Sequence, residues 1–197
     1  MKYSGITDKT ADNLLLDAGA FFKNFIVGTD TFESAVTANK LIGATQGGGS
    51  FSAIPTIRKI DVDGTMGVRK GLQHIDEWVV TISANVKEIS QDTIKIALGS
   101  GDVVDGPNNY KKITANHQIR LTDYIDNITW VGKLSGSEMP VIIVVKNALA
   151  TSGLTLNVAD KAEAVIAMTF TGHFTNNDPL VPPFEIYYPN KEVTGEE

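Results

Sequence analysis

Apolar and polar residues alternate over two long stretches of the chain, and each stretch predicts a β-strand with one buried face. In residues 76–88 the apolar face consists of Trp78, Val80, Ile82, Ala84 and Val86. In residues 162–175 it consists of Ala164, Ile166, Met168, Phe170 and Phe174. Because successive side chains of a strand point to opposite sides of the sheet, the intervening, mostly polar residues share the other face. Both strands are therefore expected to cover a core with one side only.

A second pattern predicts a long β-hairpin around the first of these strands. Residues 56–63 read as its partner strand, and Asp63-Gly64 follows as a turn signal. The stretch from Gly64 to His74 is too long for a tight turn, so we predict a projecting loop over residues 64–74. The glycine run at residues 47–49 lacks the Lys-Ser/Thr of a phosphate-binding loop and precedes a strand, so we interpret it as a flexible turn.

Residues 90–98 predict one α-helix. Ser90 is a favourable N-cap, and Gly99 is a natural stop. Residues 14–25 (LLLDAGAFFKNF) are interpreted as a short helical or irregular segment, and the weakly patterned residues 32–41 are compatible with a strand.

The second half of the chain adds further strands. One or two are predicted in residues 113–131 with a break near 123–127, one in the apolar residues 140–147, and a short one at 184–188. The composition of residues 101–112 is that of a loop. Together these elements predict a single, mainly β domain: a sandwich or barrel with one flanking helix. Its extended parts are an N-terminal arm (1–31), the hairpin loop (64–74), the loop (101–112) and a C-terminal tail (189–197).

Composition narrows the class of protein. A length of 197 residues fits one domain, and 17 basic against 23 acidic residues give a net charge of −6, which disfavours a nucleic-acid binder. The absence of cysteine excludes disulfides and thiolate metal sites. The start of the chain is unlike a signal peptide, and the longest apolar run, residues 141–145, is too short for a bilayer span. We expect a soluble product with no membrane segment.

The search for catalytic chemistry yields no motif. The three histidines, His74, His117 and His173, lack metal-ligand spacing, and Asp61 to Gly64 lacks most of a calcium loop. There is no GxSxG elbow and no carboxylate pair suited to acid–base work. We therefore predict a protein that is not an enzyme, with no catalytic residue, metal or cofactor.

Several blocks of sequence, in this order, resemble the major tail tube proteins of siphophages from Gram-positive hosts. The blocks are LLLDAGAFFKNF, IGATQGGGSF, IRKIDVDGTMGVRKG, the strand followed by the helix at Ser90, YIDNITWVGKLSG, DKAEAVIAMTFTGHF and PFEIYYP, which together span nearly the whole chain. The resemblance implies a β-sandwich with a flanking helix. It further implies that six copies form a ring, and that stacked rings enclose a channel lined by a continuous β-barrel. Related tubes occur in type VI secretion and in contractile tails.

The resemblance also implies roles for individual residues. Polar strand faces would line a weakly acidic channel that repels DNA, and the lumen-facing residues are Glu77, Thr81, Ser83, Asn85, Glu163, Thr169, Thr171 and Asp61. Loops would join stacked rings, and the contact residues are Gly64, Met66, Arg69, Lys70, Asp102, Asn108 and Tyr110.

The implied partners are further copies of the chain, a tape-measure protein, and tail-tip and tail terminator proteins. DNA would cross the lumen without specific binding, and no membrane is involved. The implied location is the virion tail, assembled in the cytoplasm of the host bacterium.

Three alternatives remain open. The tube of a contractile tail or of a phage-derived bacteriocin would give the same sequence features. A ligand-binding β-sandwich would need an exposed aromatic platform, for which Trp130 is the candidate. An enzyme on a β-scaffold would need a convergent polar cluster that the sequence does not indicate.

Overall fold

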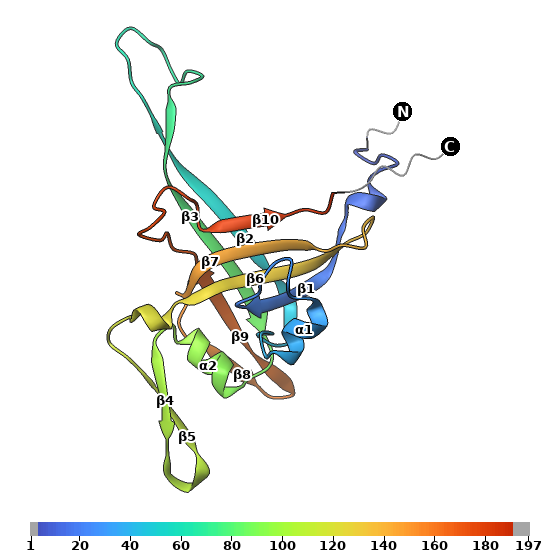
Figure 1. Cartoon of the computed structure of the whole chain (residues 1–197), viewed down its shortest axis with the longest axis vertical. Coiled ribbons are helices and arrows are strands. Elements are labelled where there is room, and N and C mark those ends of the chain that lie inside the picture. Colours follow the sequence, from blue (N-terminus) through green and yellow to red (C-terminus); the bar gives the residue numbers. More distant parts are fainter. Residues whose placement is uncertain (1–3, 191–197) are drawn as a thin grey trace.

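The computed structural model describes residues 4–190 and has a mainly β architecture with two α-helices, so the predicted fold class is confirmed (Figure 1). The helices are α1 (Phe32–Thr37) and α2 (Gln91–Ala97). The strands are β1 (Leu15–Lys23), β2 (Thr45–Lys59), β3 (Gln73–Val86), β4 (Gly101–Asp105), β5 (Lys111–Ala115), β6 (Ile125–Leu134), β7 (Val141–Ala150), β8 (Leu156–Ala159), β9 (Ala162–Thr171) and β10 (Phe184–Tyr187). Three short 3-10 turns lie at Ala11–Asn13, Pro107–Asn109 and Leu121–Asp123.

Eight strands form one antiparallel sheet that folds over itself into two layers. The order is β1-β6-β7-β9-β3-β2, with β10 added to β7 and β8 added to β9. The first layer holds β1, β6, β7 and β10, and the second holds β2, β3, β9 and β8 (Figure 1). Strand β7 belongs to both layers, because it pairs with β6 up to Ala148 and with β9 at Leu149 and Ala150. The crossing follows Asn147, whose φ is +47°.

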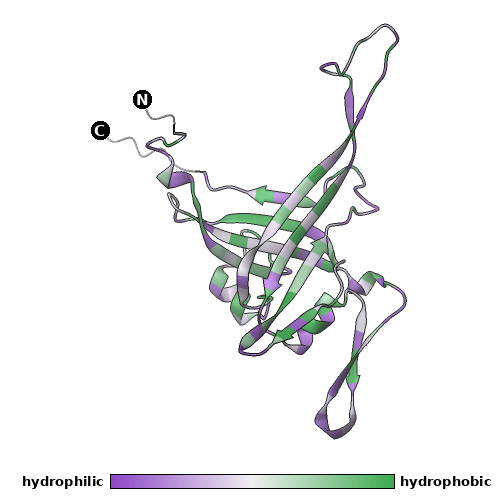
Figure 2. Cartoon of the chain, turned by 180° about the vertical axis from the view of Figure 1, so that it is seen from behind, coloured by the Kyte–Doolittle hydropathy of each residue, from purple (hydrophilic) through white to green (hydrophobic). Residues whose placement is uncertain are grey.

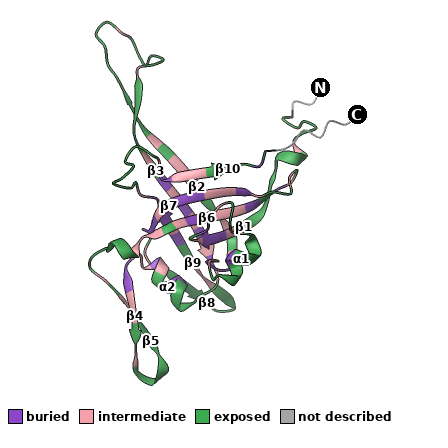
Figure 3. Cartoon of the chain, viewed as in Figure 1, coloured by how far each residue is buried: buried purple, intermediate pink, exposed green. Residues whose placement is uncertain are grey.

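The core lies between the layers and is filled by the two predicted apolar faces. Val80, Ile82, Ala84 and Val86 of β3 and Ile166, Met168 and Phe170 of β9 are all buried. They pack in one cluster with buried residues of the first layer and its flank: Phe21, Ile128, Val145 and Ala148. Figure 3 shows this burial along the central strands. Phe174 lies beyond the end of β9 and is 37% exposed, so the apolar face ends before it.

Helix α2 begins and ends where its capping residues indicate. The Ser90 hydroxyl accepts from the Thr93 amide, and the Thr93 hydroxyl accepts from the Ser90 amide, which completes a capping box. Gly99 has a φ of +72°, the left-handed conformation that terminates helices.

Helix α1 replaces the strand that residues 32–41 were compatible with. The Thr31 hydroxyl and the Ser34 side chain form a second capping box, which favours a helix from Phe32 onward. Ala35 is fully buried and packs with Phe22 and Phe25 in a separate cluster beside β1. The fold therefore has a second flanking helix in addition to the predicted one.

The prediction for residues 14–25 is wrong, because residues 15–23 form β1, paired with β6. Asp17 and Gly19 both have a φ of +66°, and the pairing register shifts between Leu16 and Ala20. This bulge interrupts the period-two pattern and hides the strand from sequence analysis. The segment 1–31 is thus not an arm throughout, and its residues 1–3 lie outside the described residues.

Two further predictions need correction. Residues 47–49 are not a flexible turn but a bulged part of β2; a Cβ on Gly49 would lie 2.0 Å from the Ser83 carbonyl oxygen. Residues 101–112 are not a loop, because β4 and β5 pair from Gly101↔Ala115 to Asp105↔Lys111.

Smaller differences concern where strands begin and end. The break in the second half falls at 116–124 rather than 123–127, and β8 was not predicted. The last residues of the C-terminal tail, 191–197, lie outside the described residues.

Two hairpins project from opposite ends of the molecule (Figures 1 and 2). One is the extension of β2 and β3 with its loop at residues 60–72, which confirms the predicted long hairpin. The other is the pair β4–β5, which we call the β4–β5 arm. Both tips are exposed in Figure 3.

Candidate functional surfaces

The second layer presents a face of hydroxyl side chains on the side away from the core. Antiparallel partners lie directly opposite each other and share a face. The register aligns them in two rows across three strands: Ser50–Ser83–Thr169 and Ser52–Thr81–Thr171. We call this surface the hydroxyl face. Five of the residues predicted to line a lumen therefore lie on one face, namely Thr81, Ser83, Asn85, Thr169 and Thr171.

Hydrogen bonds involve three of these hydroxyl groups, those of Ser50, Ser83 and Thr171. The Ser50 and Ser83 Oγ atoms lie 2.8 Å apart, and the Thr151 and Thr171 Oγ1 atoms lie 2.9 Å apart. The Ser152 Oγ accepts from the Thr169 amide at 3.0 Å. Sequence analysis missed Ser50, Ser52, Thr151 and Ser152, although the alternation of Ser50 and Ser52 around Phe51 was a usable signal.

The charged members of the predicted set lie toward the ends of this face. Glu163 forms an ion pair with Lys87 at 3.2 Å, and its own backbone amide and then Lys87 lower the pKa of its carboxyl. Glu77 is exposed and accepts from the Thr56 hydroxyl at 3.5 Å. Glu77 and Glu163 therefore add acidic character, and Glu163 is partly compensated.

Asp61 does not join the hydroxyl face. Strand β2 ends at Lys59, so Asp61 lies in the loop, where Lys59 pairs with it at 2.9 Å. Placing Asp61 on the strand was wrong because residues 60–63 continue the apolar–polar alternation after the pairing with β3 has stopped.

The predicted ring-contact residues divide between the two ends of the molecule. Gly64, Met66, Arg69 and Lys70 lie in the 60–72 loop, where Met66 is 94% exposed. Asp102, Asn108 and Tyr110 lie on the β4–β5 arm at the other end. Tyr110 is 72% exposed near the arm's tip. Asp102, in contrast, is at the base of the arm, and its carboxylate already binds Arg120 and Asn116.

The base of this arm holds the most strongly perturbed acid of the described residues. Arg120 contacts both Asp102 and Asp123, at 2.8 and 3.0 Å. The donated bonds of Arg120 lower the pKa of the Asp123 carboxyl to about 2, and a bond from Ser100 acts in the same direction. The pKa of Asp102 is lowered first by Arg120 and then by Asn116.

This shift predicts that Asp123→Asn destabilises the protein near neutral pH but not in acid. The folded state binds the proton of Asp123 less readily than the unfolded chain, whose carboxyl has the ordinary pKa of 3.8. The stabilisation is therefore complete above about pH 5 and is lost as the pH falls toward about 2. Chemical denaturation of both proteins should show a gap in unfolding free energy at neutral pH that closes in acid. A gap of equal size at both ends of this range would contradict the role of Asp123.

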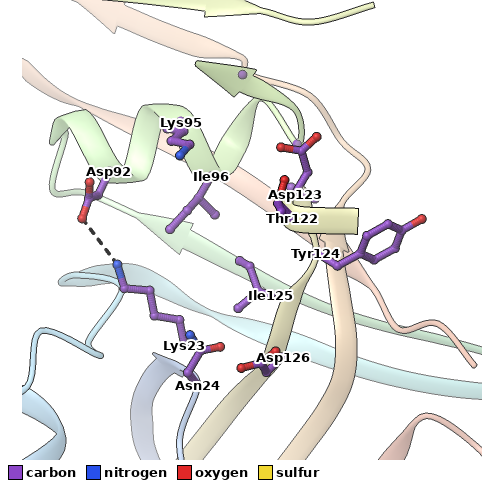
Figure 4. A pocket seen from close by; sticks show the side chains of 13 residues that line it. Lys23, Asn24, Asp92, Lys95, Ile96, Thr122, Asp123, Tyr124, Ile125 and Asp126 are labelled. Atoms are coloured by element: carbon purple, nitrogen blue, oxygen red, sulfur yellow. Dashed lines mark hydrogen bonds and ion pairs between the residues drawn. The ribbon is translucent and has the colours of Figure 1, made fainter. Parts of the chain in front are cut away.

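A shallow pocket of about 340 Å³ lies between α2, the end of β1 and the start of β6 (Figure 4). Lys23 and Asp92 approach each other across it at 3.4 Å, and Lys95, Asp123 and Asp126 add one positive and two negative charges. The mixed charges select no class of ligand.

Among residues 4–190, no three His, Asp or Glu side chains are grouped to hold a metal ion. No helix in this part of the chain is long and apolar enough to span a membrane.

Trp130 is not a free aromatic platform. Its indole N–H donates to the Ala18 carbonyl at 2.9 Å. Its ring lies so close to two glycines that a Cβ on Gly19 or Gly132 would meet it at 2.4 or 2.0 Å. The half-buried side chain thus holds the β1 bulge against β6.

No protein-family model matches the chain, and a search of curated proteins gave no match.

Proposed function

We propose that this protein is the structural subunit of a bacteriophage tail tube, in which hexameric rings stack into a hollow conduit for DNA. The observation that carries the proposal is the hydroxyl face: two rows of serine and threonine, aligned by the strand register, on the open side of a four-stranded layer. The two rows suit the wall of a water-filled channel, because they are polar without being charged.

The edges of the same layer support ring formation. Strands β2 and β8 end the layer, and no strand among the described residues pairs with the outer edge of either. The open edge of β2, 15 residues long, favours pairing with another chain, and closure of a ring removes it. Four strands from each of six copies give roughly 24 strands, a backbone circle roughly 48 Å across and a lumen of roughly 35–40 Å.

The charge of the face fits passage of DNA without retention. The rows across its middle carry no ionisable group, and Lys87 at the end of β3 is paired with Glu163. Binding of a DNA backbone depends on cations that neutralise phosphates. A wall of hydroxyl groups with a slight acidic excess gives DNA no such partner, and like charge keeps it away from the wall.

The projecting hairpins suit contact between stacked rings, because they lie at opposite ends of the subunit (Figure 1). In this proposal the chain assembles in the host cytoplasm with its own copies, a tape-measure protein, tail-tip and terminator proteins, and functions in the virion tail. The tube of a contractile tail or of a phage-derived bacteriocin belongs to the same structural class.

Negative-stain electron microscopy of the concentrated protein, paired with sedimentation velocity, tests the proposal. We expect rings or hollow tubes with six-fold views. A monomer that never assembles, even with tail-tip components added, would overturn it.

Replacing three exposed apolar side chains of the 60–72 loop is expected to abolish stacking while leaving the fold intact. Val62, Met66 and Val68 are 50%, 94% and 63% exposed, so their change to serine removes little buried surface from the subunit. In the proposed tube the same side chains become buried between rings. Micrographs should show rings or very short tubes, and thermal unfolding should be unchanged.

The matched control for this triple variant is Val36→Ser on α1, which changes an exposed valine away from both hairpins. We expect normal tubes from it. Tubes of normal length from the triple variant would rule out a stacking contact through this loop.

A further inference from the structure

The pairing within the β4–β5 arm does not fix the direction in which the arm points. Its two five-residue strands pair only with each other, in a sheet separate from the main one. An isolated two-stranded hairpin is marginally stable in water. The arm nevertheless leaves the body at a defined angle beside α2 (Figure 1). Contacts at its base must therefore supply the order that its own pairing does not.

The polar contacts at the base centre on the Arg120 guanidinium. On the arm side, Arg120 donates to the two carboxylate oxygens of Asp102, at 2.8 and 3.3 Å. On the body side it donates to both oxygens of Asp123, at 3.0 and 3.3 Å, immediately before β6 begins. The planar guanidinium suits this arrangement because its donors form a rigid fork.

Three further bonds complete the cluster. The Arg120 amide donates to Asp123 Oδ2 at 2.8 Å, and Ser100 Oγ donates to the same oxygen at 2.8 Å. Asn116 Nδ2 donates to Asp102 Oδ2 at 3.0 Å. Ser100 precedes β4 and Asn116 follows β5, so both ends of the arm are tied to the same group of side chains.

Exposure distinguishes the two carboxylates. The Asp123 side chain is 5% exposed, whereas those of Asp102 and Arg120 are each 45% exposed. Asp123 is thus the fixed anchor in the body, and Asp102 is the outer attachment point on the arm. The lowered pKa values of both carboxyls agree with a cluster in which each is held ionised.

We propose that Arg120 is a positioning residue that fixes the direction of the β4–β5 arm before assembly, so that the arm meets the next copy already ordered. The positioning of the arm concerns the isolated subunit, whereas its contact with the next copy rests on the proposed tube function. At the arm, Val104 and Tyr110 are 49% and 72% exposed and are available for such a contact. An ordered arm binds without a further entropic cost, whereas a mobile one has to be immobilised on contact.

Amide hydrogen exchange on the unassembled protein tests the positioning role. In Arg120→Ala we expect exchange of the amides in residues 101–115 to rise about tenfold, with the amides of β3 and β9 unchanged. Asp102→Asn is the second variant, because it loosens the arm while leaving the buried Asp123 paired with Arg120. Lys111→Ala is the control, since it removes only the exposed pair between Lys111 and Asp105 near the tip.

Unchanged exchange of the arm in both Arg120→Ala and Asp102→Asn would overturn the proposal. Faster exchange together with tube growth slowed about tenfold would support both the positioning role of Arg120 and the need for an ordered arm in assembly. Faster exchange with normal tube growth would overturn the claim that assembly needs an ordered arm. If the wild-type protein never assembles, the tube function fails, but the exchange measurement still decides whether Arg120 positions the arm.

Discussion

Tubes built from a Thr81→Lys variant are expected to assemble normally and to retain DNA. Thr81 lies in the middle of the hydroxyl face, between Ser52 and Thr171. A lysine there can extend its ammonium group away from the sheet. In the proposed hexamer, each ring would then carry six new cations facing the channel. Because several phosphates would be neutralised at once, affinity for DNA should rise steeply at low salt.

The measurement is the fraction of genomes ejected from virions that contain the variant. We expect this fraction to fall roughly a hundredfold at physiological salt. It should partly recover as the salt concentration is raised, because salt cations compete with the lysines for the phosphates. Thr81→Gln is the neutral control at the same site, and Thr37→Lys places the same charge on the exposed surface of α1. Equal ejection from Thr81→Lys and Thr37→Lys virions would show that the hydroxyl face does not line the channel.

Phe170→Ala is expected to remove much of the stability of the subunit. Phe170 is fully buried, lies opposite Ile82 across β3 and β9, and packs in the cluster that joins the two layers. Truncation of a buried phenylalanine costs about 3–5 kcal/mol, because the transferred surface is lost and a cavity remains. This is a large part of the 5–15 kcal/mol that holds a typical domain folded. Guanidinium denaturation should show a lower midpoint with little change in slope.

Phe174→Ala provides the matched control, since the residue type and the truncation are the same. Phe174 is 37% exposed beyond the end of β9, so its loss should cost less than about 1 kcal/mol. Equal destabilisation by the two variants would contradict the assignment of Phe170 to the core and Phe174 to its margin.

Sequence analysis succeeded where one local signal agreed with the tertiary environment. The alternation in β3 and β9 is strict because one face packs on the other layer and the opposite face meets water. The capping box of Ser90 and the glycine at 99 mark α2 without reference to the rest of the fold. The hydroxyl face was predicted in part for the same reason: its β3 and β9 members alternate with buried residues.

The wrong predictions for β1, the β4–β5 arm and Asp61 have physical causes that lie elsewhere in the fold, so the local sequence pattern does not reveal them. In β1, the bulge at Asp17 and Gly19 shifts the phase of the alternation, and Trp130 compensates for it from another strand. The β4–β5 arm has the composition of a loop because few of its residues are buried. The side chains that bond to its base include Arg120 and Asp123, which lie in the segment after it. The end of β2, which excludes Asp61 from the face, is set by pairing with β3.

Strand β7 links the two layers mechanically, because this one strand pairs with β6 in the first layer and with β9 in the second. A tensile load on the β2–β3 extension passes through β3 to β9 and reaches β7 at Leu149 and Ala150. From there it is carried by covalent bonds into the ladders with β6 and β10. The two layers cannot be pulled apart along their side-chain contacts alone, since the strand that joins them must also be sheared from its neighbours. In the proposed tube, this link would keep the two layers of each subunit together under load.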